Sequence, residues 1–82
     1  MFVFSTVLFV NGLPVAYQVY KEYRLVFKPA VTGNVSTAAP VLFAEKKNNN
    51  WIITGTTDVN LEAQAIEDIQ NNEHKLVAGH TA

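Results

Sequence analysis

The residue types best suited to chemistry are few and scattered in this chain. Its two histidines, His74 and His80, lie close to Glu73 near the C-terminus. Histidine and carboxylate groups can ligate zinc, but no other ligand cluster supports these three, so we expect solvated histidines and no metal site. Glu67 and Asp68 are adjacent, and adjacent side chains diverge on a helix. We therefore expect a charged solvent face there rather than a catalytic carboxylate pair.

Recognised catalytic motifs are missing from the sequence. It has no phosphate-binding glycine loop and no Gly-x-Ser-x-Gly nucleophile turn. It also has no cysteine, which removes thiolate zinc ligands, cysteine nucleophiles and disulfides. We therefore predict that the protein is not an enzyme and has no catalytic residue, metal or cofactor. No segment carries the signature of a known family.

One polar patch supports a binding hypothesis. Tyr20, Arg24 and Lys28 are spaced by four residues, so they lie on the same face of an extended strand. Aromatic rings interleaved with cations can form a stacking platform for single-stranded nucleic acid. The six Lys and Arg residues are balanced by seven Asp and Glu, however, and a chain without basic bias argues against a nucleic-acid partner. An ordinary solvated sheet face is the preferred interpretation, and weak single-strand binding is the alternative.

The run from Val15 to Lys28 must position this patch. Its odd positions are apolar or aromatic except for Lys21, and its even positions are mostly polar, which is typical of a half-buried strand. A single extended strand over this run would span about 46 Å, longer than a compact domain of this size is wide. We expect a bulge or tight reversal at Tyr20–Glu22, where Lys21 places a charge on the apolar face.

The N-terminal run Phe2–Val10 is apolar on both faces, which predicts a strand covered on both sides. Asn11-Gly12 follows it and favours a type I′ hairpin turn. Pro14 cannot donate a ladder hydrogen bond and should lie at the start of the next strand. The two strands should therefore be antiparallel neighbours.

The same N-terminal segment has a competing interpretation as a secretory signal peptide in residues 1–16. Its apolar run has the length of a signal sequence, but no Lys or Arg precedes it, and Pro14 falls where a small residue is needed. The run is too short for a transmembrane helix. We therefore predict a cytoplasmic protein with no membrane association, and secretion is the alternative.

The rest of the chain predicts a second hairpin and a helix. Val41–Lys46 and Trp51–Thr56 should pair around an asparagine tip at residues 48–50. We expect Trp51 to anchor a core or an interface rather than to stack on a ligand. Leu61, Ala65, Ile66 and Ile69 form one apolar stripe, so a helix should run from about Val59 to Asn71 with Thr57 or Asp58 as its cap.

These elements predict an α+β fold: a four-stranded, mostly antiparallel sheet made of two hairpins, with one C-terminal helix packed on one face. Residues 1–72 should form the single domain, residues 30–40 a loop, and residues 73–82 a flexible tail. The expected core residues are Phe4, Leu8, Tyr17, Val19, Leu25, Phe27, Phe43, Ile53, Leu61, Ala65, Ile66 and Ile69.

The apolar content, 49% of 82 residues, is high for a small domain. One helix can cover only one face of the sheet, which leaves Val3, Val7 and Phe9 of the first strand in need of other cover. We therefore predict a small protein-interaction or assembly module whose partner is a second copy or another protein. Val3, Val7 and Phe9 are its expected dimer interface. The rival is a monomer in which the 30–40 loop, or Leu76 and Val77, folds over that face.

Overall fold

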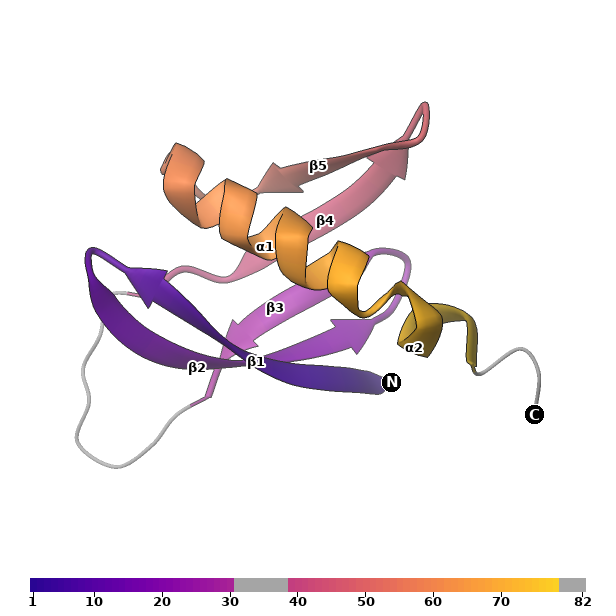
Figure 1. Cartoon of the computed structure of the whole chain (residues 1–82), viewed down its shortest axis with the longest axis horizontal. Coiled ribbons are helices and arrows are strands. Elements are labelled where there is room, and N and C mark those ends of the chain that lie inside the picture. The colour runs from indigo at the N-terminus through magenta and orange to yellow at the C-terminus, as the bar shows by residue number, and fades with distance from the viewer. Residues whose placement is uncertain (31–38, 79–82) are drawn as a thin grey trace.

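A computed structural model describes residues 1–30 and 39–78 (Figure 1). The strands form one antiparallel sheet whose spatial order follows the chain order. The elements are β1 (Phe2–Val10), β2 (Leu13–Lys21), β3 (Leu25–Pro29), β4 (Leu42–Lys47), β5 (Asn50–Thr54), α1 (Val59–Asn71) and α2 (Glu73–Ala78). The α+β class, the antiparallel sheet and the C-terminal helix are confirmed, whereas the sheet has five strands instead of the four predicted.

The extra strand arises because the Val15–Lys28 run reverses direction. β2 ends at Lys21, which pairs with Leu25 at the start of β3. Within the reversal, the backbone N–H of Glu22 donates to the carbonyl of Arg24 over 2.9 Å. The reversal thus begins at the charge that interrupts the apolar alternation.

Asparagine supplies the backbone conformation that both two-residue hairpin turns require. Asn11 and Gly12 have φ values of 54° and 81°, as the predicted type I′ turn needs. Asn48 and Asn49 have φ values of 52° and 65° in the β4–β5 turn. Asn50, predicted at the tip, instead begins β5, because a two-residue turn is enough to join the strands.

Helix α1 begins and ends where the sequence predicted. The Asp58 carboxylate caps it by accepting from the backbone N–H groups of Asn60 (2.9 Å) and Leu61 (3.3 Å). Leu61, Ala65 and Ile69 are buried on one side of the helix. α1 contacts β1 and β5, the two edge strands, so it spans the open side of the sheet.

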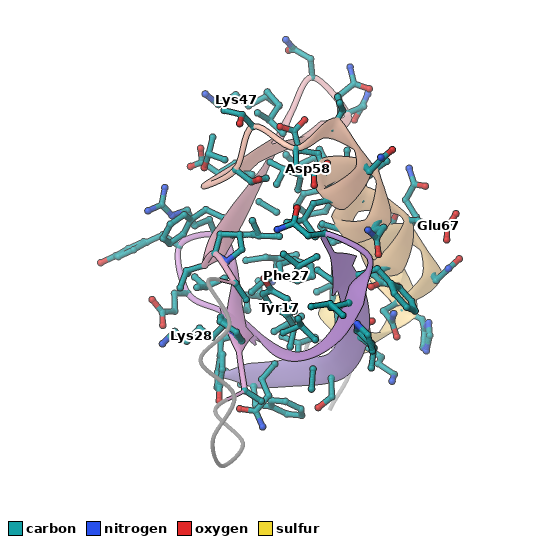
Figure 2. The ribbon with its side chains drawn as sticks, turned by 90° about the vertical axis from the view of Figure 1, so that its left-hand side faces the viewer. Tyr17, Phe27, Lys28, Lys47, Asp58 and Glu67 are labelled. Carbon is teal, nitrogen blue, oxygen red and sulfur yellow. The ribbon has the colours of Figure 1, made fainter. Side chains whose placement is uncertain are left out.

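The core lies between α1 and the face of the sheet that curls around Tyr17 and Phe27 (Figure 2). Ten of the twelve predicted core residues are buried, whereas Phe43 and Ile66 are only half-buried. The prediction for β4 chose the wrong face: Leu42 and Ala44 point into the core, so Phe43 between them points away. The prediction also missed buried Val15 and Val26.

The C-terminal segment differs from the predicted tail. Residues 73–78 form α2, and Leu76 packs against the core. Residues 31–38 and 79–82, which include most of the predicted loop and His80, lie outside the described residues. In the part of the chain that is described, no helix is long and apolar enough to cross a membrane.

Candidate interaction surface

The sheet has a second face, opposite α1, which we call the outer face. Strand side chains alternate between the two faces, so the residues between buried core positions belong to it. On β1 these include Val7 and Phe9, whose side chains are 53% and 54% exposed. Phe2 and Ile52, at the two sheet edges, are 50% and 44% exposed. Large apolar side chains therefore face solvent across a sheet that α1 covers only on its other side.

The predicted interface residues of β1 divide into two groups. Val7 and Phe9 lie together on the outer face, opposite Ala16 and Pro14 of β2. A register shift between Phe2 and Phe4 makes Val3 the extra residue of a bulge. Val3 is half-buried and packs against the core, so it does not lie with the other two residues.

A cross-strand row of apolar side chains occupies the middle of the outer face. Val26 of β3 pairs with Tyr20 of β2 on one side and with Phe43 of β4 on the other. The ring of Phe2 meets that of Tyr20 edge-on, with centroids 5.9 Å apart. Val26, between Tyr20 and Phe43, is only 5% exposed although it lies on the face opposite α1. Only the strand register reveals this row, so the sequence patterns missed it.

The three residues of the predicted nucleic-acid patch lie on this face but come from three different elements. Tyr20 is on β2, Lys28 is on β3 and Arg24 is in the turn between them. The Lys28 ammonium lies 5.1 Å from the centroid of the Tyr20 ring. The Arg24 guanidinium instead lies 4.1 Å from the centroid of the Phe43 ring. Each cation thus covers an aromatic ring, and the structure joins Tyr20 to Lys28 but not to Arg24.

These cation–π contacts determine what the rings can bind. An exposed contact of this kind contributes about 0.5–1 kcal/mol. Stacking of a nucleobase on an aromatic side chain contributes about 1–3 kcal/mol. A base stacked on this side of the Tyr20 ring would have to displace Lys28. The Tyr20 hydroxyl already donates to Gln18 Oε1 over 2.9 Å, which holds the ring in place.

The free edge of β1 is covered by α1. Gln64 accepts from the backbone N–H of Phe9 over 2.8 Å and donates to its carbonyl over 2.9 Å. One helical turn further on, Asp68 accepts from the Thr6 hydroxyl over 2.6 Å. The contacts of Gln64 occupy backbone groups of Phe9 that another strand would need at this edge. A partner can therefore reach β1 more easily from the outer face than from the edge.

Glu67, Asp68 and His74, among the residues that first suggested chemistry, do not converge in the described part of the chain. Asp68 contacts Thr6 across to β1, while Glu67 is exposed on the far side of α1 (Figure 2). His74 is exposed on α2. Within residues 1–30 and 39–78, no three metal-ligating side chains form a group that could hold an ion.

Tyr17 is the side chain whose pKa is shifted most clearly by its surroundings. It is fully buried, and its hydroxyl donates to the carbonyl of Pro40 over 2.8 Å. Burial raises the pKa of Tyr17 above its ordinary value of 10.0, because the phenolate would lose its hydration. At neutral pH this residue is an uncharged core group with a structural hydrogen bond.

Comparisons with known proteins give no relative: no family model, curated protein or solved structure matches this chain.

Proposed function

We propose that the protein is a small non-enzymatic interaction module whose outer face binds a protein partner, and that a second copy of the chain is that partner. The observation that carries this proposal is the exposure of Phe2, Val7 and Phe9 on a sheet face that α1 does not cover. Soluble monomers rarely expose large contiguous apolar patches without a use for them.

Stacking of two outer faces is the arrangement that the contacts favour. Edge pairing through β1 would compete with the two hydrogen bonds between Gln64 and the backbone of Phe9. Covering the exposed half of Phe2, Val7 and Phe9 on both copies would contribute about 6 kcal/mol, taking roughly 1 kcal/mol for each half side chain. Association costs about 4–15 kcal/mol, so this patch alone supports a weak, concentration-dependent dimer.

Sedimentation across a wide concentration range tests the proposal. The wild-type chain should shift from a 9.1 kDa species towards twice that mass as the concentration approaches the millimolar range. Phe9→Asp should remain a monomer throughout, because the dimer would bury an unpaired carboxylate.

Val59→Asp is the matched control for this substitution. Val59 is 74% exposed and begins α1, away from the outer face, and a carboxylate suits the first turn of a helix. This variant should dimerise like the wild type. A wild-type chain that stays at 9.1 kDa at every concentration would contradict the dimer, and so would a Phe9→Asp variant that still associates.

A second candidate function is weak binding of single-stranded nucleic acid on the same face. The pairing of Lys28 with Tyr20 and of Arg24 with Phe43 favours it, because each pair brings a cation and an aromatic ring together on this face. A fluorescent oligothymidine should then bind at low salt and dissociate as salt is added. Arg24→Ala should weaken this binding, whereas Lys75→Ala removes the same charge from α2 and should not. Equal weakening of oligothymidine binding by the two substitutions would contradict this second function.

A further inference from the structure

The two hairpins separate at one end of the sheet. The pairing of β3 with β4 stops at Leu25 and Ala44, while β4 continues alongside β5 as far as Lys47. The β2–β3 turn and the tip of the β4–β5 hairpin therefore diverge, and α2 lies at the same end of the molecule (Figure 1). A cavity of about 470 Å³, which we call the end pocket, opens between them.

The inner wall of the end pocket is apolar. Leu25 and Ala44 form part of it and are buried. Trp51 and Leu76 complete it from β5 and α2, and both side chains also pack against the core. A volume within about 300–1,000 Å³ and apolar walls are typical of sites for small organic ligands.

The rim of the end pocket is positively charged. Four of the chain's six lysine and arginine residues line it: Lys21, Arg24, Lys46 and Lys47. Two carboxylates, from Glu45 and Glu73, also line it, so the surplus is two positive charges. Four of the seven acidic residues instead belong to α1 and its cap: Asp58, Glu62, Glu67 and Asp68. The formal net charge of −1 therefore conceals a cationic end.

Trp51 joins the two parts of the pocket. Its ring lies 5.7 Å from the ammonium of Lys46, so an apolar wall and a rim cation meet at this residue. Its indole N–H is buried and has no acceptor among the described residues. A buried donor without an acceptor is costly, so this indole N–H is sensitive to changes in the packing around Trp51.

We propose that the end pocket binds a small organic anion with a flat apolar body, of the aromatic carboxylate class. The apolar wall takes the ring system, the rim cations attract the carboxylate, and Trp51 lies where the two meet. The end pocket does not include Val7 or Phe9, so ligand binding does not depend on a dimer formed through those residues. The pocket shares Arg24 with the outer face, because this residue also lies over Phe43.

Titration of the isotope-labelled full-length chain with naphthoate, followed by amide correlation spectra, tests the proposal. The single tryptophan gives one indole N–H signal, which reports directly on the pocket. That signal and the amides of Leu25, Ala44 and Leu76 should shift and saturate. Naphthamide, which has a similar shape without the charge, should bind about tenfold more weakly, equivalent to 1.4 kcal/mol.

A pair of matched charge substitutions separates site binding from general attraction. Lys46→Gln should weaken naphthoate binding several-fold, because it removes the cation beside Trp51. Lys28→Gln removes the same charge from the outer face and should leave the affinity unchanged. The dispersion of the amide spectrum shows directly that each variant is folded.

Several outcomes would overturn the proposal. One is the absence of any saturable shift of the Trp51 indole signal at millimolar naphthoate. Equal affinities for naphthoate and naphthamide would remove the role of the rim cations. Equal weakening by Lys46→Gln and Lys28→Gln would show diffuse charge attraction. Shifts centred on Val7 and Phe9 would place the ligand on the outer face.

Discussion

Similar apolar side chains on the two faces of the sheet have different surroundings. Phe27 on the inner face is fully buried, whereas Phe9 on the outer face is 54% exposed. Neighbours on β1 differ in the same way: Leu8 is buried and Val7 is half exposed. Both faces carry aromatic and β-branched residues, although the outer face also carries polar ones such as Gln18 and Lys28. For matched apolar neighbours such as Leu8 and Val7, the difference is α1, which covers one face only.

Truncation of one phenylalanine on each face should give the largest contrast. Phe27→Ala should lower the free energy of unfolding by about 3–5 kcal/mol, because it removes a buried ring in contact with those of Phe4 and Tyr17. Phe9→Ala should cost about 1 kcal/mol or less, because half of that ring is already in water. Urea denaturation of dilute, monomeric protein measures both.

Similar costs for these two substitutions would erase the contrast between the faces. They would mean that the outer face is covered in the dilute chain as well, as it would be in the rival monomer. The midpoint should move while the denaturant slope stays constant, because neither change alters the surface that unfolding exposes by much.

A smaller loss of stability should follow from removing the buried hydroxyl of Tyr17 in the inner core. Tyr17→Phe removes the hydrogen bond to the Pro40 carbonyl and should cost about 1 kcal/mol at neutral pH. In the wild type the burial of Tyr17 raises its pKa, so its contribution to stability is complete below about pH 10 and is lost as the pH rises beyond that value.

Thermal unfolding at several alkaline pH values can isolate this contribution. Lysine residues titrate in the same range, so the wild type must be compared with Tyr17→Phe rather than with itself at neutral pH. The stability difference between the two proteins should shrink above pH 10. A difference that stays constant would show that the Tyr17 hydroxyl ionises as freely in the folded chain as in the unfolded one.

The smallest loss of stability should come from a substitution at the β1 edge, where the two faces of the sheet meet. Gln64→Ala removes both hydrogen bonds to Phe9 and should cost about 0.5 kcal/mol, because water can replace these exposed contacts. The same change uncovers the β1 edge for pairing with another strand. Sedimentation should therefore show stronger association of Gln64→Ala than of the control Gln70→Ala, whose side chain is exposed on α1. Equal association would show that the edge plays no part.

Local features of the fold could be predicted because neighbouring residues determine them. The Asn11-Gly12 turn, the Asp58 cap and the bounds of α1 each depend on a few adjacent side chains. The β4 strand could not be oriented in this way. Its residues Leu42, Phe43 and Ala44 are all apolar, so the alternation of polar and apolar residues does not orient it. Phe43, the largest of the three, was predicted to point into the core, but the register places Leu42 and Ala44 there.

The candidate surfaces were harder to predict because they depend on contacts between distant residues. Tyr20 and Lys28 were expected on one face of one strand, but they meet across two strands instead. Lys21 and Lys46 are far apart in the chain, and only the divergence of the hairpins brings them to the same pocket. A count of charges along the sequence contains no information about such clustering.

The position of α1 has a consequence for the order in which the chain folds. Thr6 and Asp68, joined by a hydrogen bond, are 62 positions apart in the sequence, and the helix that closes the core is synthesised after all the strands of the sheet. Contacts between residues so distant form late and slow the search for the native state. A ribosome must therefore release the sheet and α1 before the inner face is covered. Until then both faces of the meander are open, and the nascent chain depends on fast completion to escape aggregation.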